Sequence, residues 1–189
     1  MRKKRICIIA SFFVLIFISG IIATNVKFHK YMKAEEVSSD DWFESNGYAI
    51  KFNEYKVVDM DELQNDYITD EKQFETYKKV FEFDGKVVLV YATLKIIDKD
   101  KMNKDWWTDY ILYSDNAWRN AISINLVSII RDASPAKGNY INGNEYNLIF
   151  PYEISKVQVP DWNFDEAKNW NYSIVWSQNP IVYAELKQK

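Results

Sequence analysis

The longest hydrophobic run of the chain lies close to its N-terminus. Residues 6–23 contain no charged side chain, and they follow four basic residues, Arg2 to Arg5. As a helix with a rise of about 1.5 Å per residue, this run would be roughly 27 Å long, close to the hydrocarbon thickness of a bilayer. A core helix of a soluble protein would show a polar stripe, and this run has none. The pattern therefore predicts a single transmembrane helix at residues 6–23.

The flanking residues bear on cleavage and orientation. A secretory signal peptide ends in small residues spaced as in A-x-A, and no such pair ends this run. The only cysteine, Cys7, lies at the start of the run, so there is no lipobox. We favour a retained signal anchor, with a cleaved signal peptide as the alternative. Basic residues favour the cytoplasmic side, so residues 1–5 are expected in the cytoplasm and the C-terminal part outside the cell membrane.

A linker is expected between the membrane and the outer domain, over residues 24–47. Its first part, Lys27 to Lys33, is basic and aromatic and suits the lipid headgroup region. Its second part, Ala34 to Gly47, is polar and acidic. We therefore place one extracytoplasmic domain at residues 48–189, which is long enough to form its own core.

Two-residue alternation of apolar and polar positions dominates this domain and predicts strands. Tyr48, Ile50 and Phe52 share one strand face, and the alternation continues after an expected bulge. The segment 86–97 is apolar on both faces and rich in β-branched residues, so it should be a central strand. Further strands are predicted at 110–113 and 145–150, with a closing pair at 172–176 and 181–186. Residues 121–130 could be a helix or a strand, and their β-branched content favours a strand.

Turn signals and helical spacing complete the predicted fold. Asp84-Gly85 and Asn142-Gly143 suit hairpin turns, which would pair residues 80–83 with the central strand and residues 140–141 with 145–150. Only 70–80 and 165–170 have a helical pattern. Many short strands with turns between them indicate a mainly β fold. The specific prediction is an immunoglobulin-like antiparallel β-sandwich with one or two short helices.

Composition excludes several functions. After the first basic block, 20 Lys and Arg face 27 Asp and Glu, and an acidic domain is a poor partner for nucleic acid. The single histidine, His29, precedes the domain, so neither a Ser-His-Asp triad nor a histidine zinc site can form. Thiolate metal sites need outer cysteines, which are absent. We expect no enzyme activity, no cofactor and no metal, although a pair of carboxylates for glycoside hydrolysis stays open.

Some short motifs resemble known sites but lack their context. Ser134 and Lys137 satisfy S-x-x-K, and residues 114–116 read S-D-N, as in penicillin-recognising enzymes. Their order is inverted, K-T-G is absent, and Pro135 indicates a loop where a helix is needed. The acidic stretch 98–105 lacks the glycine and the final glutamate of a Ca²⁺ loop. Asp59, Asp61, Glu62 and Asp66 could coordinate a metal ion, but a solvated acidic edge is the better interpretation of this stretch.

Aromatic residues are the remaining signal. Most of the seven tryptophans are expected in the core, but adjacent Trp106 and Trp107 would point opposite ways on an extended chain, which would expose one of them. Trp162 follows Pro160-Asp161 in an expected loop. These three residues are the candidate interface, because tryptophan anchors protein contacts and stacks on sugars.

The anchor, the strand 86–97, the segment 150–152 and the ending 170–180 together resemble a known group. They are similar to small extracytoplasmic immunoglobulin-like proteins of unknown function from low-GC Gram-positive bacteria, many of which carry a lipobox that this chain lacks. The resemblance implies the sandwich and no catalytic residue. The leading hypothesis is a membrane-anchored binding or accessory module for a protein or cell-wall component. A glycan-binding domain using exposed tryptophan is the alternative, followed by a carboxylate-dependent wall hydrolase.

Overall fold

The computed structural model describes residues 34–81, 85–130, 134–178 and 181–189. The predicted cytoplasmic tail, the anchor at 6–23 and residues 24–33 lie outside the described residues. Within the described part, no helix has both the length and the apolar character needed to cross a bilayer.

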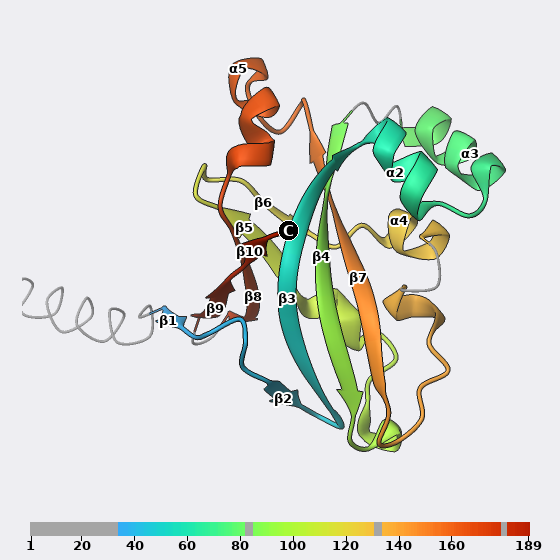
Figure 1. Ribbon diagram of the computed structural model, residues 1–189, viewed down its shortest axis with the longest axis vertical. Helices are drawn as coiled ribbons and strands as arrows, with labels where there is room; N and C mark the ends of the chain where they lie inside the picture. The colour runs from blue at the N-terminus through green and yellow to red at the C-terminus, as the bar shows by residue number, and fades with distance from the viewer. Residues whose placement is uncertain (1–33, 82–84, 131–133, 179–180) are drawn as a thin grey trace, which may run out of the picture.

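The protein is mainly β and consists of two sheets (Figure 1). The first sheet, sheet A, has the strand order β1 (Glu35–Glu36), β9 (Ile181–Glu185), β8 (Tyr172–Gln178), β5 (Ile111–Ser114) and β6 (Arg119–Ala121). The second, sheet B, has the order β10 (Lys187–Gln188), β3 (Tyr48–Asp59), β4 (Gly85–Ile96) and β7 (Glu145–Ser155), and β2 (Phe43–Ser45) also pairs with β3. The pairs β1–β9 and β10–β3 are parallel, so the prediction of a wholly antiparallel sandwich is wrong at these two edges.

The core between the sheets follows the alternation of β3. Tyr48, Ile50 and Phe52 are buried in it, the register shifts between Phe52 and Glu54, and Tyr55 then continues the same face. The predicted strand face and its bulge are therefore confirmed.

The strand β4 is central, as predicted, because β3 and β7 flank it. Val88 and Val90 face the core between the sheets. Val87 and Leu89 face a second hydrophobic cluster, which lies beneath the helices α2 (Met60–Tyr67), α3 (Glu71–Phe81) and α4 (Ile124–Ile129). The apolar character of both strand faces thus reflects two different cores on the two sides of sheet B.

Several predicted strands are helices or turns. Residues 124–129 form α4, because the Ser123 hydroxyl caps the amide of Leu126 and Leu126 then faces the second cluster. The predicted strand 80–83 is wrong at its start, since α3 continues to Phe81; residues 82–84 lie outside the described residues. Residues 140–141 form no strand, and Asn142-Gly143 instead belongs to a turn packed against the end of β4.

The helices were only partly predicted. The helix at 70–80 is confirmed as α3, where the Asp70 carboxylate accepts a hydrogen bond from the amide of Gln73. The turn at 165–170 is confirmed as the 3-10 helix η4 (Asp165–Asn169), which follows α5 (Asp161–Phe164). The acidic stretch after Asp59, predicted as a solvated edge, forms α2 with Asp59 as its N-cap.

Part of the expected linker belongs to the sheets. Residues 35–36 are β1, and residues 43–45 pair with 48–50 around Asn46-Gly47, a turn suited to a two-residue hairpin. The ordered fold therefore includes residues well before position 48. The predicted closing pair is confirmed as β8 and β9, after which the chain crosses to sheet B as β10.

Candidate functional site

Two turns meet at the end of sheet B where β4 ends and β7 begins. The amide of Lys99 donates a hydrogen bond of 2.7 Å to Asn142 Oδ1, and the amide of Gly143 donates one of 2.8 Å to the Ile96 carbonyl. We call the surface formed by residues 97–109 and 134–144 the tip. It also contains three 3-10 helices, η1 (Lys99–Lys101), η2 (Trp106–Asp109) and η3 (Pro135–Lys137).

A pocket of about 260 Å³ opens in the tip. Aromatic side chains and two lysines contribute to its lining. The lining includes Lys99, Met102, Lys104, Trp106, Trp107 and Tyr140. The Tyr140 hydroxyl donates a hydrogen bond of 2.8 Å to the Pro135 carbonyl, and this bond ties Tyr140 to the start of η3. Burial raises the pKa of Tyr140 above its ordinary value, so the hydroxyl stays a neutral donor.

The structure brings Trp106 and Trp107 into this pocket, but as buried residues. They are 4% and 8% exposed, and the ring of Trp106 packs 4.8 Å from that of Tyr48. The expectation that one of them is exposed is wrong, because they lie in the 3-10 helix η2 and the two-residue alternation of an extended chain does not apply there. Trp162 lies in α5, away from the tip in sequence, and its side chain is outside what the structure describes.

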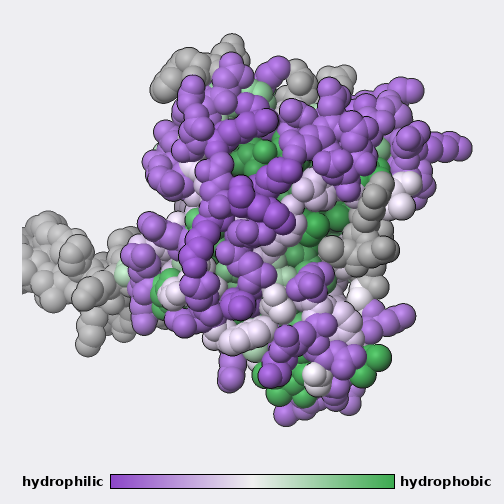
Figure 2. All heavy atoms as spheres, viewed as in Figure 1, coloured by the Kyte–Doolittle hydropathy of each residue, from purple (hydrophilic) through white to green (hydrophobic). Residues whose placement is uncertain are grey.

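Two isoleucines next to the pocket are exposed, and neither is among the interface residues predicted from the sequence. Ile97 is 51% exposed and Ile141 is 61% exposed. Both lie in the hydrogen-bonded turns, beside the lining residues Lys99 and Tyr140. Figure 2 shows hydrophobic atoms at this lower end of an otherwise largely hydrophilic face. The pair Ile96-Ile97 carried a usable signal, since adjacent residues at a strand end face opposite ways and only one can be in the core.

The charge at the pocket is positive within an acidic domain. Lys99 and Lys104 line it, and none of the described residues in its lining is Asp or Glu. The nearby Asp98 is engaged by Lys101, whose ammonium lies 2.9 Å from the carboxylate and holds the pKa of Asp98 below its ordinary value. A ligand entering the pocket would therefore meet two lysines.

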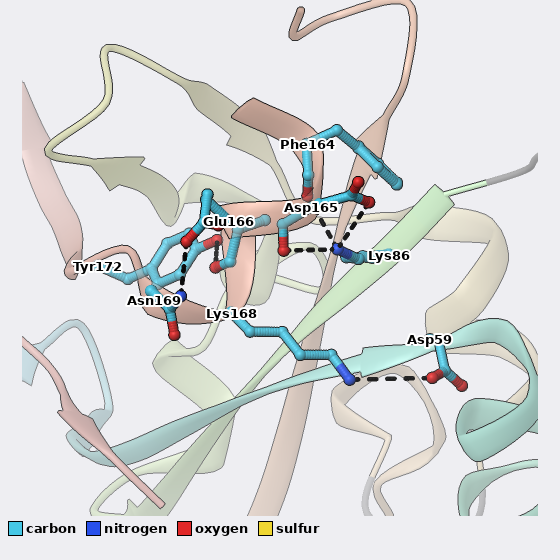
Figure 3. A network of polar contacts seen from close by, with 9 residues as sticks. Asp59, Lys86, Phe164, Asp165, Glu166, Lys168, Asn169 and Tyr172 are labelled. Atoms are coloured by element: carbon cyan, nitrogen blue, oxygen red, sulfur yellow. Dashed lines mark hydrogen bonds and ion pairs between the residues drawn. The ribbon is translucent and has the colours of Figure 1, made fainter. Parts of the chain in front are cut away.

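A second polar cluster surrounds Lys86 at the opposite end of β4 (Figure 3). The Lys86 ammonium donates hydrogen bonds of 2.9 and 3.1 Å to the carbonyls of Phe164 and Asp165, and it lies 4.7 Å from the centre of the Phe164 ring. Burial lowers the pKa of Lys86. Because its contacts are main-chain carbonyls at the junction of α5 and η4, the side chain fastens this segment to sheet B.

The motifs that resembled catalytic sites have structural roles. The Ser134 hydroxyl is buried and donates a hydrogen bond of 2.5 Å to the Val127 carbonyl. Ser114 is the last residue of β5 and pairs with Tyr172 of β8. Among the described residues, no group of three His, Cys, Asp or Glu side chains is placed to hold a metal ion. Three pockets of the described surface have linings without any carboxylate.

Comparison with known proteins gives similarity to uncharacterised structures. No protein-family model and no curated protein matches the chain. A conserved hypothetical protein from Bacillus anthracis is 15% identical, covers 73% of this chain and 87% of its own, and has a TM-score of 0.39. An uncharacterised β-sandwich protein from Clostridium difficile is 11% identical, covers 82% and 96% of the two chains, and has a TM-score of 0.41.

Proposed function

We propose that this chain is a non-catalytic, membrane-anchored extracytoplasmic module with an immunoglobulin-like sandwich, and that its tip docks a partner protein. In this proposal residues 6–23 hold the module at the membrane and residues 1–5 remain in the cytoplasm. The observation that carries the docking step is the exposure of Ile97 and Ile141 beside a pocket whose lining includes aromatic side chains.

This arrangement has the anatomy of a protein-binding site. Exposed apolar residues that cluster around a pocket mark interaction surfaces, and interface energy concentrates where an anchor side chain fills such a pocket. The volume of about 260 Å³ is below the range of roughly 300–1,000 Å³ typical for drug-sized ligands, so the pocket suits one side chain. Lys99 and Lys104 would favour an acidic residue beside that anchor.

The burial of the tryptophans favours a protein over a glycan. A sugar-binding site presents an open aromatic face on which the ring of the sugar stacks. Trp106 and Trp107 line the pocket but are both less than one tenth exposed, so neither offers an open ring face for stacking. The tip instead offers aliphatic side chains, which bind by burial of apolar surface.

Site-specific photo-crosslinking in the native membrane, followed by binding of purified proteins, tests this proposal. A benzophenone side chain at position 141 should give a discrete protein adduct, whereas one at position 157 should not. Val157 is a matched control because it is apolar, 95% exposed, and lies just after β7 at the end of that strand away from the tip.

The captured partner is then purified and its affinity measured against variants of the full chain. Ile141→Asp and Ile97→Asp should weaken binding tenfold or more, and Val157→Asp should leave it unchanged. Reversing Lys99 and Lys104 to Glu should slow association and reduce its salt dependence. Equal effects of the Ile141 and Val157 substitutions would overturn the docking site. Binding of cell-wall glycans that these isoleucines do not influence would support the glycan alternative instead.

A further inference from the structure

The outer face of sheet A carries a second surface, independent of the tip. Helices cover part of the outer face of sheet B, whereas the outer face of sheet A has a groove of about 430 Å³. The groove is lined by Tyr113, Arg119, Ser173, Val175, Ile181 and Tyr183. The intervening residues Leu112 and Ile174 point the other way, into the core.

The strand register arranges this face in two rows that run across four strands. The first row reads Arg119, Tyr113, Ser173, Glu185, from β6 through β5 and β8 to β9. The second row, two residues along each strand, reads Ala121, Ile111, Val175, Tyr183 in the same order. Glu36 of the edge strand β1 follows Tyr183 and accepts a hydrogen bond of 3.3 Å from its hydroxyl. Neighbouring strands are about 4.8 Å apart, so the ends of each row are separated by roughly 14 Å.

Each row is complementary to its own reversed copy. Reversal places Arg119 opposite Glu185, and both are exposed and without an ion pair in the described part of the chain. It places the large Tyr113 opposite the small Ser173. In the second row it places Tyr183 opposite Ala121, and Ile111 opposite Val175.

We propose that a second copy of this chain packs on this face, forming a two-fold symmetric dimer. The symmetry axis would run parallel to the strands, between β5 and β8 and midway between the facing sheets. A two-fold axis in that position reverses the order across the strands while it keeps the position along them, which is the reversal that pairs opposite charges and large with small side chains. Facing sheets pack about 10 Å apart, a separation that these side chains span.

The small size of this face limits the expected affinity of the dimer. Four strands span only about 19 Å, so the contact belongs with the smaller interfaces, which are weak and transient. We expect a dissociation constant in the micromolar range or above. Confinement to a membrane would raise the effective concentration of such a pair.

Charge reversal in the purified full chain, in density-matched detergent micelles, tests the dimer by sedimentation equilibrium. Arg119→Glu and Glu185→Arg should each weaken self-association tenfold or more, because each places like charges opposite one another twice. The double variant should recover association to within about threefold of the original chain. An equimolar mixture of the two single variants should recover it too, as a heterodimer. Glu44→Arg, on β2 of sheet B, is the control and should have no effect.

The outcomes separate this dimer from other occupants. A chain that stays monomeric at every concentration tested, or a dimer insensitive to both single reversals, overturns the proposal; the second result would place self-association in the membrane segment or on another face. If the double variant and the mixture keep native circular dichroism and still fail to recover association, the reversed pairing is wrong. If a different protein or a lipid surface binds this face, the double reversal would not restore that binding.

Discussion

Gly47→Ala should destabilise the protein far more than Gly143→Ala, although both glycines have positive φ angles, +88° and +86°. Gly47 lies in the turn between β2 and β3. Its carbonyl accepts hydrogen bonds from the amides of Ile97 at 3.0 Å and Asp98 at 2.8 Å. A Cβ atom at Gly47 would lie 2.2 Å from the Asp98 carbonyl oxygen, whereas one at Gly143 would meet nothing within 4 Å.

The structure allows the two costs to be separated. Alanine in the left-handed region costs about 1–2 kcal/mol, of which about 0.4–1 kcal/mol is offset by the lower entropy of the unfolded chain. Gly143→Ala should therefore lower the free energy of unfolding by about 0.5–1.5 kcal/mol. At Gly47 the backbone clash must also be relieved by moving the turn away from residues 97–98. That movement removes two hydrogen bonds worth about 0.5–1.5 kcal/mol each, so the total cost at Gly47 is about 1.5–4.5 kcal/mol.

Urea unfolding monitored by tryptophan fluorescence measures both values, because the buried tryptophans report the core. Gly47→Ala should lower the denaturation midpoint clearly more than Gly143→Ala, at an unchanged denaturant slope. If the two substitutions cost the same within about 0.5 kcal/mol, the close approach of Gly47 to the tip would be refuted.

Other predictions concern titration and local strain. Burial raises the pKa of four core tyrosines above the ordinary value of 10.0, so the unfolded state loses these protons first as the pH rises. The free energy of unfolding should therefore fall above pH 10 by about 1.4 kcal/mol per pH unit for each tyrosine. Absorbance at 295 nm should change together with near-ultraviolet circular dichroism. These tyrosines are Tyr110, Tyr140, Tyr152 and Tyr172; their titration without unfolding would contradict the reasoning. Ala117 has a φ of 60°, so Ala117→Gly should raise the free energy of unfolding by about 0.5–1 kcal/mol, whereas Ala121→Gly in β6 should lower it. Lys86→Met should cost about 1–2 kcal/mol through lost hydrogen bonds to Phe164 and Asp165. Because the folded pKa of Lys86 is lowered, the stability of the original chain relative to this variant should rise with pH between that pKa and 10.5, and a constant difference would show that Lys86 is not desolvated.

The sequence predicted strands best where the pattern of burial is local. In β3 the alternation of Tyr48, Ile50 and Phe52 and its interruption by a bulge were readable, because each residue faces one core or the solvent. The central position of β4 was readable for the same reason. Residues 124–129 were predicted as a strand because β-branched residues favour strands, but the cap at Ser123 and burial against the helical side of sheet B outweighed that preference.

The sequence before position 48 contains a signal for the hairpin that the structure shows there. Asn46-Gly47 is a strong hairpin dipeptide, yet it was assigned to the end of a linker because the preceding residues are polar. β1 and β2 are edge strands, and edge strands need no apolar alternation, since one side of them is solvated. The charged residues that suggested a linker are compatible with that position.

Sequence pattern and composition were enough to predict one hydrophobic segment followed by an acidic, mainly β domain. The single cysteine and the single histidine of the chain both lie before that domain. The sequence also indicated Trp106 and Trp107 as residues of interest. The folded arrangement was needed to show that both are buried, that Tyr140 lines the same pocket, and that Ile97 and Ile141 are exposed beside it. Local pattern could not predict this pocket, because its residues come from turns some forty positions apart that contact one another, as Lys99 and Asn142 do. Local periodicity predicts which face of a strand is apolar. Which two turns lie side by side depends on which strands pair, here β4 with β7.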